Sequence, residues 1–204
     1  MKPAAPLLFV FLLLALESIT EPSLAEEAVL SEGGYKMITG AVYWTVPATK
    51  RSGGVRSMSV NGSCSPRLLY QAAPGVDGDM IIFSVPNRPP NNDPGYTPVV
   101  PLSTDLDIVS PTFRTAVPDP CNLMLRWQIS YDNHVKQHFV VWADEGRRNN
   151  GYFRIEKLGS SYYFRFCWSK TVCKNVGIYL LNGIRRLALT DIPILVKFKG
   201  GIAF

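Results

Sequence analysis

The sequence lacks the motifs on which most enzymes depend. It contains no Gly-x-Ser-x-Gly elbow, no His-Glu-x-x-His pair and no phosphate-binding glycine loop. It has two histidines, His134 and His138, and the tract that contains them leads into a strand and offers no third metal ligand. Asp105 and Asp107 would share one strand face, but without a second catalytic element we expect ordinary surface acids. We therefore predict no enzyme, no metal site and no cofactor.

Long apolar runs are almost absent. The one extended run, Pro6–Leu16, is shorter than the roughly 20 residues that cross a bilayer. It follows Lys2 and precedes the small residues of Ser23–Ala25, which is the arrangement of a secretory signal peptide. We predict a signal peptide over residues 1–25, a folded domain over residues 26–204 and no membrane anchor. The protein is then expected in the extracellular space or the vacuole.

Long charge runs are absent as well. The formal net charge is +5, and the basic residues include three scattered pairs, Lys50-Arg51, Arg147-Arg148 and Arg185-Arg186. No run of five or more like charges occurs, so solvated surface charge is the expected role. Together with secretion, this excludes nucleic acid as the expected partner.

Cysteine is limited to four residues, Cys64, Cys121, Cys167 and Cys173, and no Cys-x-x-Cys zinc spacing occurs. In a secreted chain an even number of cysteines predicts disulfides, and four cysteines allow three connectivities. Pairing neighbours along the chain is the simplest of the three. Asn61 begins the N-glycosylation sequon Asn-Gly-Ser and is the candidate glycosylation site.

Helical periodicity is missing, whereas period-two alternation of apolar and polar residues recurs throughout the chain. About a dozen short strands separated by Gly, Pro, Asn and Asp indicate an all-β protein, either a barrel or a sandwich. The alternation predicts strands at residues 41–46, 67–71, 80–85, 106–109, 125–129, 138–143, 153–155, 163–166, 176–181, 186–190 and 194–198.

A proline-rich segment, Ser84–Pro101, interrupts this pattern with six prolines. It could link two domains or form a stiffened loop that is presented to a partner. The first half of the chain has too few strands for a separate domain, which favours one domain with a presented loop.

The segment Val29–Ala48 resembles the opening signature of the plant Kunitz-type inhibitors related to soybean trypsin inhibitor. Later blocks, among them "GSCSPRLLYQ" and "YFRIEKLGSSYYFRFC", are similar to family blocks in the same order, so the resemblance extends from Val29 to Lys199. Serine replaces the usual aspartate at position 31, and threonine replaces an aliphatic residue at position 45. The matching signature positions are Val29, Gly34, Met37 and Tyr43.

The resemblance implies a β-trefoil with twelve strands in three pseudo-repeats and disulfides Cys64–Cys121 and Cys167–Cys173. It also implies a monomer that inhibits a secreted or vacuolar endopeptidase, a serine protease first and a papain-like protease second. The reactive loop would follow the strand over residues 80–85, with Arg88 filling the primary pocket of a trypsin-like enzyme. The loop residues that the resemblance assigns are Pro86, Asn87, Arg88, Pro89 and Pro90.

Three features oppose strong trypsin inhibition. Pro89 follows the bond that would be attacked and restricts the backbone of Arg88. Thr39 stands where the family has an asparagine that braces the loop, and a threonine hydroxyl has a single donor. The loop is also longer than in small inhibitors. The alternative is a non-inhibitory trefoil protein for storage, defence signalling or ligand binding, including an acidic polysaccharide on a basic face.

Overall fold

The computed structural model describes residues 27–60, 62, 64–86, 98–111, 124–144 and 150–202. These residues form strands and turns, and no helix occurs among them. The twelve strands are β1 (Val42–Pro47), β2 (Val55–Ser59), β3 (Arg67–Gln71), β4 (Met80–Ser84), β5 (Asp107–Val109), β6 (Leu125–Asp132), β7 (Gln137–Asp144), β8 (Tyr152–Leu158), β9 (Ser161–Cys167), β10 (Cys173–Leu181), β11 (Ile184–Thr190) and β12 (Val196–Ile202).

Strands β1, β4, β5, β8, β9 and β12 close into a barrel. Antiparallel pairing joins β1 to β4, β4 to β5, β8 to β9, β9 to β12 and β12 back to β1. The remaining gap, between β5 and β8, is closed by a bridge from Leu106 to Phe153. A closed barrel leaves no sheet edge open for association with another chain.

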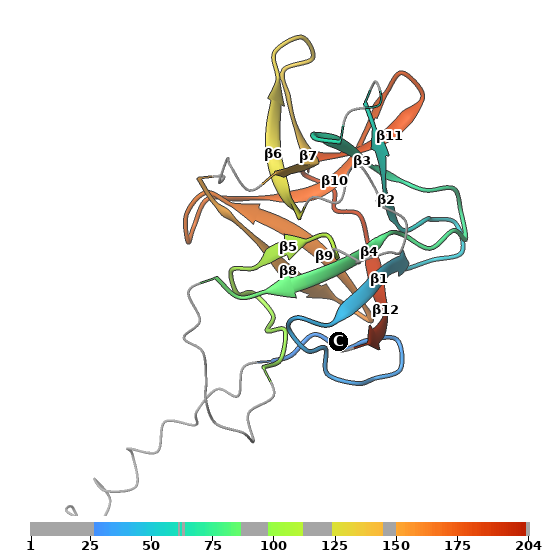
Figure 1. The fold of residues 1–204 in the computed structure, drawn as a ribbon, viewed down its shortest axis with the longest axis vertical. Helices are drawn as coiled ribbons and strands as arrows, with labels where there is room; N and C mark the ends of the chain where they lie inside the picture. The colour runs from blue at the N-terminus through green and yellow to red at the C-terminus, as the bar shows by residue number, and fades with distance from the viewer. Residues whose placement is uncertain are drawn as a thin grey trace, which may run out of the picture.

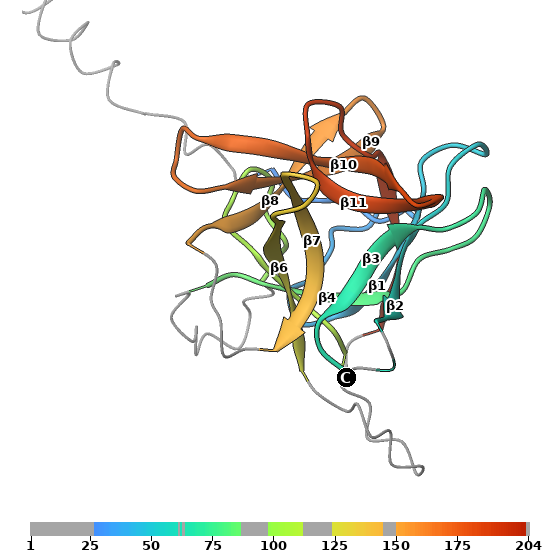
Figure 2. The same cartoon turned by 90° about the horizontal axis from the view of Figure 1, so that it is seen from above.

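Three hairpins, β2–β3, β6–β7 and β10–β11, cover one end of this barrel (Figure 1). Their inner strands β3, β7 and β11 pair with one another, so the hairpins meet around a common centre (Figure 2). Each third of the strand series therefore supplies two barrel strands and one hairpin. We call these three hairpins the cap.

The core inside the barrel is largely aromatic. Phe83, Phe164 and Phe198 come from three different barrel strands and have no solvent exposure. The rings of Phe83 and Phe198 are 5.4 Å apart and edge-to-face, and Trp127 lies 4.8 Å from Phe164 in a similar arrangement. Such contacts add about 0.5–1.5 kcal/mol per pair to the burial of apolar surface.

Every predicted strand overlaps a strand of the structure, although several bounds differ by up to four residues and one strand was missed. Strand β2 was not predicted, because its sequence VRSMS has no apolar alternation and only Val55 is buried. Its five residues all pair with β3, so tertiary pairing rather than pattern forms the strand. The strand predicted at residues 194–198 begins two residues later, at Val196. The Ile194 N–H bonds to the Val176 carbonyl on β10 and not to a neighbouring strand of the barrel.

The structure describes one complete disulfide, which joins the paired strands β9 and β10. Cys167 and Cys173 are opposite each other on β9 and β10 and form a disulfide. Cys64 is also disulfide-bonded, and its expected partner Cys121 lies outside the described residues.

Thr45, which departs from the family signature, is a fully buried polar residue with satisfied hydrogen bonds. Its Oγ1 accepts from the Val55 N–H at 3.0 Å and donates to the Val55 carbonyl at 3.2 Å. The Gly78 N–H donates to the Thr45 carbonyl at 2.6 Å, and a Cβ at position 78 would lie 2.0 Å from Thr45 Oγ1. An aliphatic residue at position 45 could not make the two bonds to Val55.

We predict that Thr45→Val lowers the free energy of unfolding by about 1–3 kcal/mol, because the buried Val55 N–H loses its acceptor, whereas the Val55 carbonyl keeps the bond from the Asp79 N–H. Denaturant titration of both proteins measures this difference. Thr171→Val, the same change at an exposed position, should stay within about 0.5 kcal/mol of the parent. Equal stability of Thr45→Val and the parent protein would contradict the assigned role.

Candidate functional site

The proline-rich loop leaves the barrel after β4 and is next described at Pro98. Its downstream end, residues 98–102, lies against residues 27–39, which we call the opening segment. The Val29 N–H donates to the Val100 carbonyl at 2.9 Å, and the Val100 N–H donates to the Met37 carbonyl at 2.8 Å. Isolated bridges join Ala28 to Pro101 and Ile38 to Val99. The opening segment therefore forms the stem on which the loop ends.

Two successive residues hold the two sides of the loop. The Gly40 N–H donates to the Phe83 carbonyl at 2.9 Å, which fixes the upstream side at β4. The Thr39 N–H donates to the Pro98 carbonyl at 2.9 Å, which fixes the downstream side. Gly40 has a φ of 82°, a backbone conformation in which a side chain is strained, so glycine suits this position. The two sides of the loop are thus both hydrogen-bonded to the consecutive residues Thr39 and Gly40.

Apolar side chains and one buried phenol anchor this stem to the barrel. Val29, Met37 and Val100 have no solvent exposure. The Tyr43 hydroxyl accepts a hydrogen bond from the Ile38 N–H at 2.7 Å, and Tyr43 is itself 2% exposed. Burial raises the pKa of the Tyr43 phenol above its usual 10.0, and the bond from Ile38 opposes that rise in part. The stem lies at the end of the barrel away from the cap (Figure 1).

Of the predicted reactive-loop residues, Pro86 is described and is half-buried at the upstream side of the loop. Asn87, Arg88, Pro89 and Pro90 lie outside the described residues, as do Asn61 and the Arg147-Arg148 pair. The structure thus describes the base of the predicted loop.

Thr39, the predicted brace, contacts the downstream side of the loop. Its Oγ1 and its N–H both donate to the Pro98 carbonyl, at 3.3 Å and 2.9 Å. One acceptor therefore receives both bonds. The role of Gly40 was missed by the sequence reasoning, although a glycine directly after the brace position could have indicated a constrained turn.

The acidic pair Asp105 and Asp107 is bound by arginines. Asp105 pairs with Arg154 at 2.6 Å, and Asp107 pairs with Arg126 at 2.6 Å. The two carboxylates serve in ion pairs, Asp105 with Arg154 of the barrel strand β8 and Asp107 with Arg126 of the cap strand β6, as expected for ordinary surface acids.

The two histidines are not brought together as ligands. The His134 backbone N–H donates to Asp132, and the exposed His134 side chain lies in a turn. His138 is half-buried, with its ring 4.7 Å from Tyr131 and 6.1 Å from Trp168. Within the described ranges, no three His, Cys, Asp or Glu side chains gather as a metal site, and no helix is suited to cross a membrane.

Most of the aromatic residues on or beside the strands are packed in the interior. Tyr43, Trp127, Trp142 and Phe166 are at most 3% exposed, whereas Trp168 is 40% exposed.

Comparison with solved structures identifies the fold as a β-trefoil. Soybean trypsin inhibitor, solved in complex with porcine pancreatic trypsin, superposes with a TM-score of 0.67 and is 21% identical. The match covers 85% of this chain and 98% of the soybean chain. The twelve-strand trefoil expected from the resemblance is confirmed.

Sequence comparison identifies the family. The family model Kunitz_legume, described as trypsin and protease inhibitor, matches residues 29–200. Kunitz trypsin inhibitor 5 from Arabidopsis thaliana is 29% identical, covering 95% of this chain and 97% of the relative. Miraculin from Synsepalum dulcificum is 31% identical, covering 88% of this chain and 86% of the relative. The chain belongs to this Kunitz-type family, which is a family of protease inhibitors and not of enzymes.

The buried Tyr43 predicts a specific alkaline destabilisation. Because its pKa is raised in the folded protein, the unfolded chain loses the phenolic proton first, and stability falls as pH rises above about 10. Tyr43→Phe lacks this proton, so the stability difference between the parent protein and Tyr43→Phe should shrink above that pH. Urea unfolding of both proteins from pH 7 to 11 measures it.

Tyr35→Phe is the matched control, since Tyr35 is 78% exposed. It should show the same pH profile as the parent protein. A difference between the parent and Tyr43→Phe that stays constant up to pH 11 would contradict the buried role of this hydroxyl.

Proposed function

We propose that the protein is a monomeric, secreted protease inhibitor that presents the loop around Arg88 to a serine endopeptidase. The observation that carries this proposal is the hydrogen-bonded stem, in which the Thr39 and Gly40 N–H groups bond to the two sides of the loop. A loop with fixed ends has lost much of its conformational freedom during folding, so less is lost when a protease binds. Its prolines restrict the backbone further.

Arg88 supplies the chemistry for a trypsin-like target. A guanidinium forms bidentate hydrogen bonds with a carboxylate, and trypsin carries an aspartate at the base of its primary pocket. The relatives support this target class, since they include a trypsin inhibitor from Arabidopsis thaliana and a soybean inhibitor solved with porcine trypsin. A papain-like cysteine protease is the second candidate target.

Two residues favour the alternative, a trefoil protein that does not inhibit proteases. Pro89 removes a backbone donor beside the bond that trypsin would attack. Thr39 donates both of its bonds to one carbonyl, whereas the asparagine that the resemblance implies could donate two bonds from its side chain. Miraculin, which is not named as an inhibitor, is a relative at similar identity.

The test is a titration of trypsin, chymotrypsin, subtilisin and papain with the protein produced without residues 1–25. We expect stoichiometric loss of trypsin activity, and Arg88→Ala should weaken trypsin binding by about 30-fold or more, the effect of losing an interface hot spot. Thr39→Asn should tighten binding, because its amide adds a donor at the loop base. Measured inhibition constants for the three proteins decide both points.

Arg56→Ala is the matched control, since Arg56 lies on β2, away from the loop base, and pairs with Asp79. It should inhibit as the parent protein does. Inhibition of papain alone would reassign the target class, and no inhibition of any of the four enzymes at micromolar protein would favour the non-inhibitory alternative.

We also propose that residues 1–25 are removed during secretion to the extracellular space or the vacuole. The short apolar run after Lys2 and the small residues before Glu26 support this proposal. Expression of the full chain in plant cells should yield a protein whose amino-terminal sequence begins at Glu26. Recovery of the protein with residues 1–25 intact would contradict it.

A further inference from the structure

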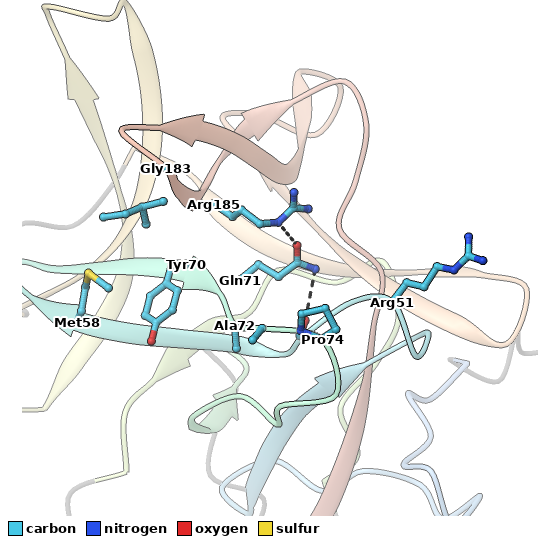
Figure 3. Close-up of a pocket in the computed structure, with 11 residues that line it drawn as sticks. Arg51, Met58, Tyr70, Gln71, Ala72, Pro74, Gly183 and Arg185 are labelled. Atoms are coloured by element: carbon cyan, nitrogen blue, oxygen red, sulfur yellow. Dashed lines mark hydrogen bonds between the residues drawn. The ribbon is translucent and has the colours of Figure 1, made fainter.

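A pocket of about 460 Å³ lies in the cap, between the β2–β3 hairpin and the turn that joins β10 to β11 (Figure 3). Its volume falls within the roughly 300–1,000 Å³ typical of small-molecule sites. Met58, Tyr70 and Arg185 of its lining belong to the cap hairpins, and the cap is at the opposite end of the barrel from the loop stem (Figure 1). The pocket is therefore separate from the proposed inhibitory site.

One arginine of this pocket is held in place by a neutral partner. Arg185 Nε donates to Gln71 Oε1 at 2.8 Å, and Gln71 is 8% exposed. The Gln71 amide nitrogen in turn donates to the Gly53 carbonyl at 3.4 Å, which orients its oxygen toward Arg185. Figure 3 shows this chain of contacts. The terminal nitrogens of Arg185 have no hydrogen-bond partner among the described residues.

The charge of this arginine is not balanced by a carboxylate. The charged residues that line the pocket are Arg51 and Arg185, and no Asp or Glu lines it. Six other cations of the described residues form ion pairs with carboxylates, in Arg56–Asp79, Arg126–Asp107, Arg154–Asp105, Lys157–Glu27, Lys174–Asp191 and Lys199–Asp77. Arg185 thus combines a fixed position with an available positive charge.

A second hollow, of about 570 Å³, is also lined by Gln71 and Arg185. Asp191 lines that hollow, but its carboxylate is bound by Lys174 at 2.6 Å. An anion would meet Asp191 in the second hollow, whereas the pocket of Figure 3 has no acid on its walls. The charge distribution therefore favours the first pocket.

The remaining walls of the first pocket are mainly apolar. Met58 and Tyr70 come from the β2–β3 hairpin, Pro74 follows β3, and Ile184 begins β11. Apolar walls beside a fixed guanidinium suit a ligand with an apolar ring and one carboxylate, because the ring loses water on binding and the carboxylate accepts from the free Arg185 nitrogens. A fully hydrated sugar acid would leave the apolar walls unused.

We propose that this cap pocket is a binding site for small apolar carboxylates, with Arg185 as the carboxylate-binding residue and Gln71 as the residue that positions it. Arg51 adds a second positive charge on the pocket lining. Planar donors of arginine match the geometry of a carboxylate better than the ammonium of a lysine does. Selectivity for the anionic ligand over its neutral analogue is the direct consequence.

The test uses 2-naphthoate as the probe and 2-naphthamide as its neutral analogue, measured by isothermal titration calorimetry at low salt. We expect one saturable site for 2-naphthoate, bound at least about tenfold more tightly than the amide, as a charge-assisted hydrogen bond allows. Arg185→Gln should abolish this preference. Arg185→Lys should keep part of it, because the charge remains and the planar fork is lost.

Gln71→Glu is a second variant with a different prediction. A carboxylate at position 71 would pair with Arg185 and occupy its charge, so 2-naphthoate should bind at least about tenfold more weakly. Arg185→Gln changes an exposed residue and keeps the proposal testable if the buried Gln71→Glu change prevents folding.

Lys199→Gln is the charge-matched control, since it removes an exposed cation that pairs with Asp77 on another part of the surface. It should bind 2-naphthoate as the parent protein does. Equal binding of 2-naphthoate and 2-naphthamide, or unchanged binding by Arg185→Gln, would overturn the proposal. Neither result depends on protease inhibition, because the pocket is in the cap and the described base of the loop is at the other end of the barrel.

Discussion

Strand β1 pairs with β12 on one side and with β4 on the other, and this double pairing closes the barrel. The opening segment leads directly into β1, and the proline-rich loop leaves directly from β4. Because β1 and β4 are neighbours, Gly40 can reach the Phe83 carbonyl and Thr39 can reach Pro98. The position of the loop base is thus a consequence of barrel closure, and a change that opened the β1–β12 pairing would also release the stem.

Burial of a few apolar residues makes this arrangement rigid. Val29, Met37 and Val100 lie at the stem with no exposure, and the aromatic rings of Phe83 and Phe198 meet in the barrel directly behind β4. Loops of inhibitors benefit from such support, because order that is established during folding is not lost again on binding. The cap hairpins cover the other end of the barrel and leave a hollow between β3 and β11, where Arg185 donates a hydrogen bond to Gln71. The molecule therefore separates its two candidate binding regions along the barrel axis.

Much of the fold could be predicted, because strands with one buried face have alternating apolar and polar residues. The runs that contain Phe83, Trp127 and Phe164 alternate clearly, and each is a strand in the structure. Strand β2 could not be predicted, since its partner β3 supplies the hydrogen bonds and only Val55 enters the core. At the candidate site, the family resemblance pointed to Thr39, which does bond to the Pro98 carbonyl, whereas the assignment of the reactive loop stays a prediction. The paired use of Thr39 and Gly40 depends on a contact between residues about 60 positions apart, which no local pattern records.

The order of residues alone established an all-β chain, the Kunitz-type resemblance and a stiff proline-rich segment after the strand that ends near Ser84. These properties are local, since alternation, proline content and motif spacing depend on residues that are close together in the sequence. Tertiary structure decided which atoms hold the loop, why a threonine is tolerated at position 45 and that Arg185 is held by a glutamine rather than by a carboxylate. Those properties depend on distances between strands that are remote in sequence, and such distances exist only once the barrel has closed.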